Sequence, residues 1–152
     1  MAISNRKQPN TMNNSSIIPA PPTLARYNVK LDLVEVRRNP AAFPRIKDTA
    51  YKEAVEKMTE IVYAAFFYRG QEIIVSQIKL IASALVAELM ADTKYGLKNI
   101  SWTEIGVAVR AAVLGAGKEM FGVSVASLYS AILDYVNGEG HQADRKARGG
   151  GL

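Results

Sequence analysis

Residues 110–125 read RAAVLGAGKEMFGVSV, and their glycines decide between two kinds of fold. A P-loop requires Gly, four residues and Gly-Lys-Ser/Thr after a buried strand, because its backbone cradles phosphate and its hydroxyl binds magnesium. Counting back from Gly117-Lys118, the first glycine position holds Ala112, and Glu119 stands where the hydroxyl is required. The segment before it has helical periodicity. We therefore interpret this stretch as a hinge between two helices.

Both helices that flank the hinge begin at a capping residue. Upstream, Ser101-Trp102-Thr103-Glu104 matches the capping box, in which Ser101 and Glu104 each satisfy an otherwise unpaired backbone N–H. Downstream, Ser124 is a good N-cap, and Gly138 is expected to end the last helix. The apolar faces of these helices comprise Trp102, Ile105, Val109, Ala112 and Val113 in the first, and Val125, Leu128, Tyr129, Ile132 and Val136 in the second.

Two further helices are predicted before these. The first begins at about Asp48 and ends at Gly70, and the second runs from about Gln71 to Thr93. The second is apolar over much of its circumference, which is typical of a central helix in a bundle. Their apolar residues are Tyr51, Val55, Met58, Val62 and Ala65 in the first, and Ile73, Ile74, Ile78, Leu80, Ile81, Ala84, Leu85 and Leu89 in the second. The sequence therefore predicts an all-α fold, a small bundle of about four helices over residues 48–137.

The N-terminal part has a different composition. Residues 1–26 are rich in Asn, Ser, Pro and Thr, so we expect a basic arm that is disordered alone or ordered by a partner. Residues 27–36, YNVKLDLVEV, alternate apolar and polar side chains, which predicts one strand-like segment within an extended, irregular arm over 27–47. The Gly-rich residues 138–152 are predicted to form a flexible tail.

The net charge of +5 is concentrated near the N-terminus. Residues 1–47 hold eight basic side chains against two acidic ones, whereas residues 48–136 hold eight basic and ten acidic ones. Such an arm commonly binds a polyanion or an acidic protein surface, although a solvated tail that aids solubility is an equal alternative. The candidate residues for binding nucleic acid or a partner are Arg6, Lys7, Arg26, Lys30, Arg37, Arg38, Arg45 and Lys47.

The sequence predicts no active site, no metal site and no cofactor. The single histidine, His141, lies in the predicted tail, and the absence of cysteine excludes thiolate ligands. Glu88 and Asp92 lie one helical turn apart, but we interpret them as part of a solvated acidic face. The aromatic run from Tyr63 to Tyr68 indicates core packing in preference to base stacking, with Phe67 or Tyr68 at the edge.

Residues 101–136 resemble a group of small proteins encoded by bacterial phages and mobile elements. Their pattern has a Thr-Glu helix start, a Gly-x-x-Gly turn, an aromatic-Gly step and a helix that ends in tyrosines. The matching residues are Thr103, Glu104, Gly115, Gly117, Phe121, Gly122, Ser124, Leu128, Tyr129, Leu133 and Tyr135. The chain departs from the pattern at Ala131, where Trp is usual, and at Ala116, where a charged residue is more usual. The resemblance implies a phage or mobile-element origin and a role in replication or other DNA transactions.

Two functions follow as hypotheses. The first is a non-enzymatic accessory protein of phage or mobile-element DNA metabolism, which binds nucleic acid or an acidic protein through its basic arm. The second is a structural protein of a virion or similar assembly, whose arms wrap neighbouring subunits. We expect a homo-oligomer or larger assembly in the host cytoplasm or the virion, and no association with membranes, because no apolar run reaches the length of a bilayer span.

Overall fold

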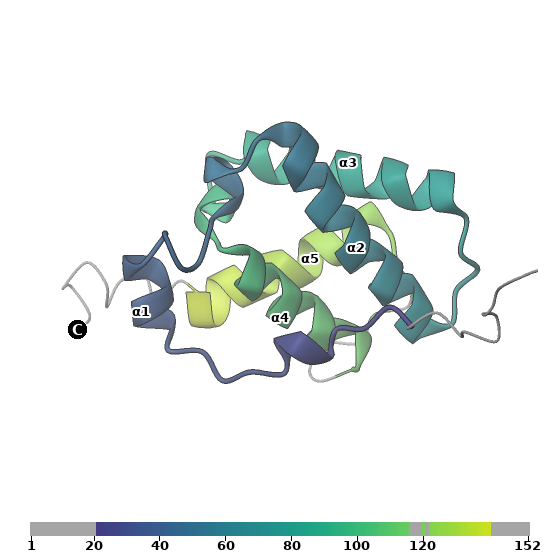
Figure 1. The fold of residues 1–152 in the computed structure, drawn as a ribbon, viewed down its shortest axis with the longest axis horizontal. Helices are drawn as coiled ribbons and strands as arrows, with labels where there is room; N and C mark the ends of the chain where they lie inside the picture. Colours follow the sequence, from purple (N-terminus) through teal and green to yellow (C-terminus); the bar gives the residue numbers. More distant parts are fainter. Residues whose placement is uncertain (1–20, 116–119, 121, 141–152) are drawn as a thin grey trace, which may run out of the picture.

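The computed structural model describes residues 21–115, 120 and 122–140, and within these ranges the protein is all-α, as predicted (Figure 1). The α-helices are α1 (Leu33–Arg38), α2 (Tyr51–Arg69), α3 (Val75–Ala91), α4 (Trp102–Val113) and α5 (Val125–Tyr135). Short 3₁₀ turns are η1 (Ala25–Tyr27), η2 (Ile46–Asp48) and η3 (Leu97–Asn99), and a π-helical turn, η4 (Val136–Gly140), continues α5 beyond Gly138. None of these helices has the length and hydropathy needed to cross a lipid bilayer.

Four helices form the body of the molecule. Helix α2 packs along α3, α4 packs against α2 and α5, and α5 also contacts α3 (Figure 1). The core between them is built from aliphatic side chains at the predicted helical spacing, among them Met58, Leu85, Leu89, Ile105 and Ile132, all fully buried. The predicted bundle is therefore confirmed, and a fifth helix, α1, lies outside it at one end.

Three ends of the body helices agree with the capping signals, whereas the prediction that Gly138 ends the last helix is wrong, because η4 runs through it. Gly70 has a φ of 69° and donates its N–H to the carbonyls at the end of α2, so that helix stops where predicted. Ser101 and Ser124 each form a complete capping box, at the starts of α4 and α5. Helix α3 is shorter than predicted. It begins only after Ile74, because Gln71 donates its N–H to Phe66 O and thereby extends the cap of α2.

The hinge is also present. Helix α4 ends at Val113, Gly115 adopts a φ of 74°, and α5 begins only at Val125. A helix therefore stands where a P-loop would need a strand. Gly117 and Lys118 lie outside the described residues.

The interpretation of α3 as a central helix is wrong. Its buried face is covered by α2 and α5, while Leu80 on the opposite face is 69% exposed and Ala84 is exposed as well. Some apolar residues of α3 are therefore not covered by any described element.

The strand predicted for residues 27–36 is wrong too. The segment leaves η1 in an irregular conformation and then forms α1, whose N-cap Asp32 accepts a hydrogen bond from the N–H of Glu35. Among the described residues there is no strand edge for it to pair with, and Val36 is buried as a residue of α1.

Residues 24–48, which we call the docked segment, lie along the bundle. Leu24, Tyr27, Val36 and Ile46 are all buried, and most of these side chains belong to the main hydrophobic core. The predicted boundary between residues 26 and 27 thus falls inside η1, with core residues on both sides. The parts of the predicted arm and tail at residues 1–20 and 141–152 lie outside the described ranges.

One close contact holds η1 against α4. A Cβ atom at Gly106 would lie 2.2 Å from the ring of Tyr27, well inside the contact distance of two carbons. Glycine in the middle of a helix usually reduces stability relative to alanine. Here it leaves the space that the Tyr27 ring occupies.

Candidate nucleic-acid interface

Three hydrogen bonds, two between backbone groups and one from a side chain, bring the docked segment to the start of α4. The Arg37 guanidinium donates to Asn99 O at 3.3 Å, and Ile46 N donates to Ile100 O at 3.1 Å. In the opposite direction, Trp102 N donates to Pro44 O at 3.0 Å. The C-terminal end of α1, the residues around η2 and the turn η3 therefore meet at one end of the molecule.

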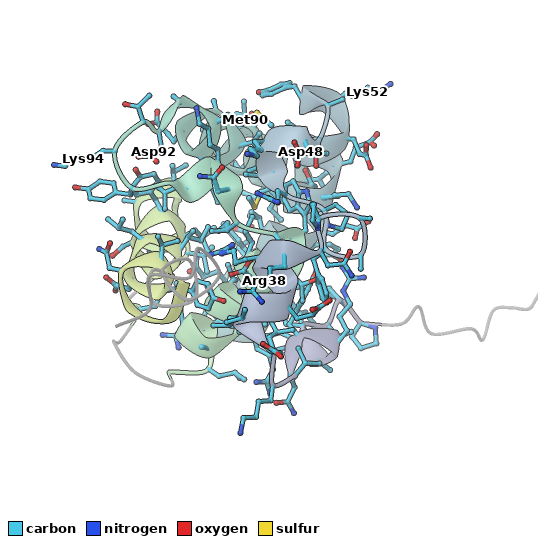
Figure 2. All side chains as sticks on the ribbon, turned by 90° about the vertical axis from the view of Figure 1, so that its left-hand side faces the viewer. Arg38, Asp48, Lys52, Met90, Asp92 and Lys94 are labelled. Carbon is cyan, nitrogen blue, oxygen red and sulfur yellow. The ribbon has the colours of Figure 1, made fainter. Side chains whose placement is uncertain are left out.

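The segments that meet at this end, or lie next to it in the chain, carry basic residues from several parts of the sequence. We call Arg38, Arg45, Lys47, Lys94 and Lys98 the cationic face. Arg38, Lys47 and Lys94 are exposed, whereas Arg45 and Lys98 are half-buried. Figure 2 looks onto this end and shows Arg38 on α1 near the centre, with Lys94 and Lys52 toward opposite sides above it.

Two carboxylates, Asp48 and Asp92, share this end of the molecule (Figure 2). The carboxylate of Asp92 accepts hydrogen bonds from the N–H groups of Lys94, Tyr95 and Leu97. Burial disfavours its charge, but these backbone hydrogen bonds outweigh burial and lower the pKa of Asp92. Asp92 thereby fixes the loop on which Lys94 is carried.

Arg37 is not part of the cationic face, which corrects its prediction as an exposed binding residue. Its guanidinium lies 2.6 Å from Oε2 of Glu104, and the two side chains are 5% and 0% exposed. The same oxygen accepts from the N–H and the hydroxyl of Ser101, and Oε1 accepts from the Tyr135 hydroxyl at 2.9 Å. We call these four residues the Glu104 cluster.

The remaining predicted residues of the docked segment are Arg26 and Lys30. Arg26 donates to the Tyr27 hydroxyl at 2.8 Å, lies 4.8 Å from the centre of that ring and pairs with Glu60 at 3.7 Å. Lys30 is exposed between η1 and α1. Arg6 and Lys7 lie outside the described residues, so the structure brings together Arg38, Arg45 and Lys47 but not all eight predicted residues.

The start of the docked segment is fixed to α2 by one hydroxyl. Tyr68 OH accepts the N–H of Leu24 at 2.8 Å and bonds to the hydroxyl of Thr23 at 3.0 Å. These two hydrogen bonds, that of Thr23 first, lower the pKa of Tyr68. In the aromatic run Phe66 is buried, Tyr68 is half-buried and Phe67 is 47% exposed, as expected for core packing with Phe67 or Tyr68 at the edge, but Tyr63 is 40% exposed.

Sequence reasoning missed Lys94 and Lys98, because it assigned binding to the N-terminal arm and treated the body as slightly acidic. It also missed the burial of Glu104, whose N3 position was recognised only as part of a cap. The structure joins Glu104 to Tyr135, 31 residues later in the chain, by a hydrogen bond.

Within the described ranges, no group of three His, Cys, Asp or Glu side chains is placed to hold a metal ion. His141 lies outside these ranges. Comparisons of the chain with protein-family models, curated proteins and solved structures found no match. The functional interpretation therefore depends on the geometry of the cationic face and its surroundings.

Proposed function

We propose that this protein is a non-enzymatic accessory protein that binds nucleic acid through its cationic face. The observation that carries the proposal is that five basic residues, from three separate parts of the sequence, belong to segments that meet at one end of the molecule. Lys and Arg neutralise phosphates and release condensed counterions, which supplies most sequence-independent affinity for nucleic acid. The proposal does not require the N-terminal arm to bind a partner by itself.

The setting of this activity is proposed from the sequence pattern. The resemblance of residues 101–136 to small phage and mobile-element proteins favours a role in replication or other DNA transactions, in the host cytoplasm or the virion. The outward side of α5 supports sequence-independent binding. Its Ser127, Ser130 and Asp134 are not the Arg, Lys, Asn or Gln that read base edges.

Salt dependence tests the proposal. The affinity for a fluorescent duplex is measured by anisotropy between 50 and about 200 mM salt for the unaltered chain, for Lys47→Gln and for Lys79→Gln. Lys79 is an exposed lysine on α3, away from the cationic face, and serves as the control. We expect a steep loss of affinity with salt, a slope reduced by about 0.9 in Lys47→Gln, and no change in Lys79→Gln. No binding of either duplex or single-stranded nucleic acid at low salt, or equal slopes in both variants, would refute the proposal.

A structural protein of an assembly is the second candidate, and the uncovered face of α3 favours it. Leu80 and Val75 are 69% and 61% exposed, and Tyr51 at the start of α2 is 52% exposed. Under this alternative the chain forms homo-oligomers through that face. Sedimentation of the full chain and of Leu80→Glu separates the candidates, because an assembly that uses α3 dissociates on this substitution and a monomer sediments unchanged.

A further inference from the structure

A cavity of about 330 Å³ lies between the start of the docked segment and α2. Its apolar lining includes the buried Leu24 and Ile61, together with Pro22 and the half-exposed Tyr63. Its polar lining includes the guanidinium of Arg26 and the carboxylate of Glu60. Cavities that hold small ligands span roughly 300–1,000 Å³, so this one falls at the lower end of that range.

The lining matches a flat ring with a polar edge. Tyr63 offers an aromatic side chain for stacking, and base–aromatic stacking tolerates any sequence because every base has a π face. Arg26 supplies hydrogen-bond donors and Glu60 supplies acceptors, as the edge of a nucleobase requires. Arg26 and Glu60 pair at 3.7 Å, but their side chains are 65% and 74% exposed. An ion pair so open to water contributes little, and a ligand can replace it.

Exposed cations lie along the docked segment between this cavity and the cationic face. They are Arg26, Lys30 and Arg38, and the exposed carboxylates Asp32 and Glu35 lie between the last two. Figure 1 shows this segment running along the lower edge of the molecule, from η1 beside α4 to α1 at the far end. Cations beside an aromatic platform are the usual combination in proteins that bind single strands.

We propose that the cavity holds an unpaired base of a single-stranded nucleic acid, whose phosphates follow Arg26, Lys30 and Arg38 toward the cationic face. This inference depends on the proposed function and adds a substrate class to it. A base inside a duplex is stacked and paired and cannot enter the cavity, whereas a base of a single strand is free to do so. The protein therefore prefers single strands to duplexes of the same sequence.

The test uses the full chain with two matched variants on α2. Tyr63→Ala removes an aromatic side chain that lines the cavity, and Phe67→Ala removes one of similar exposure a turn away that does not line it. Anisotropy gives the affinity of each protein for a mixed-sequence 20-mer single strand and for its duplex, and thermal unfolding checks that both variants are folded. We expect Tyr63→Ala to lose roughly five-fold to a hundred-fold in single-strand affinity, with duplex affinity and Phe67→Ala unchanged.

Each other outcome has a definite meaning. Equal binding of single strands and duplexes, insensitive to Tyr63→Ala, overturns the base site and leaves the proposed function standing. Equal losses in both variants place the contact on the outer surface of α2 and also overturn it. Absence of binding to either form at low salt refutes the proposed function itself. A change in sedimentation on Tyr63→Ala without a change in strand affinity makes the cavity a protein contact and overturns the inference.

Discussion

The carboxylate of Glu104 has two structural roles. It completes the capping box of α4, and it is the buried counter-ion of Arg37. Moving a charge out of water is costly, and only a close partner with further hydrogen bonds offsets that cost. Ser101 and Tyr135 supply those bonds, so every member of the Glu104 cluster depends on the others.

Glu104→Gln is expected to destabilise the protein strongly, because it leaves the guanidinium of Arg37 buried without its negative charge. Breaking a buried pair from one side costs about 3–5 kcal/mol. Urea unfolding measures the effect, with the exposed Glu88→Gln on α3 as the control, expected within about 0.5 kcal/mol of the unaltered chain. Similar free energies of unfolding for both variants would show that the pair has no energetic role.

The contact between Gly106 and Tyr27 predicts that an alanine at position 106 reduces stability, whereas alanine in place of a helical glycine usually increases it. Alanine in place of glycine inside a helix normally stabilises by about 0.5–1 kcal/mol. Gly106→Ala is nevertheless expected to destabilise, because its Cβ would overlap the Tyr27 ring. In a chain that already carries Tyr27→Ala, the same substitution is expected to stabilise. Thermal or urea unfolding of the unaltered chain, the two single variants and the double variant gives the coupling free energy between the two positions. Additive effects of the two substitutions would contradict the contact.

Neighbouring residues show where sequence reasoning reached its limit. Arg37 and Arg38 are adjacent and chemically identical, yet one is buried against Glu104 and the other is exposed on the cationic face. The sequence offered no means of separating them, since their environments depend on α1, which was predicted as strand up to residue 36 and irregular after it, and on a partner 67 residues away.

At the level of elements, the body helices were predictable because each combines a long apolar periodicity with a cap. Ser101, Ser124 and Gly70 mark three of their ends. Helix α1 has only six residues, too few to separate a period of two from one of 3.6. Its formation depends on docking against the bundle, which local propensity does not report.

The loop between α3 and η3 is expected to depend on pH through Asp92. Because its pKa in the folded chain is below the ordinary 3.8, the ionised carboxylate stabilises the protein above that pH, and the contribution is lost as the pH falls through the folded value. Asp92→Asn should therefore be less stable than the unaltered chain near neutral pH, with the difference disappearing toward acid.

Unfolding by urea at a series of pH values between 2 and 7 tests the role of Asp92, with Asp134→Asn on α5 as an exposed control. A constant difference between the Asp92→Asn variant and the unaltered chain across this range would show that the charge of Asp92 is not what holds the loop.

On the scale of the whole molecule, the docked segment belongs to the folded body. Removal of residues 1–20 is expected to leave the free energy of unfolding unchanged, because every described core residue remains. Removal of residues 1–38 also takes away Leu24, Tyr27 and Arg37, and should cost at least about 3 kcal/mol by isolating Glu104. Urea unfolding compares the two truncations, and equal losses would contradict a docked segment.

The same truncations separate the two parts of the predicted binding set. Removal of residues 1–20 deletes Arg6 and Lys7 but spares the cationic face. The positive charge of the N-terminal third was evident from the sequence. The position of this charge in the folded protein was not evident, because Lys94 and Lys98 lie near the basic residues of the docked segment only through the contacts that place η3 beside that segment.

The Glu104 cluster also bears on the order of events during translation. Arg37 leaves the ribosome 67 residues ahead of Glu104, and Glu104 leaves it 31 residues ahead of Tyr135. The first third of the nascent chain therefore has no charge partner until α4 has been synthesised, and its acceptor is complete only when α5 emerges. The complete set of hydrogen bonds around Glu104 accordingly forms only after Tyr135 has been synthesised, whatever the speed at which the separate helices form.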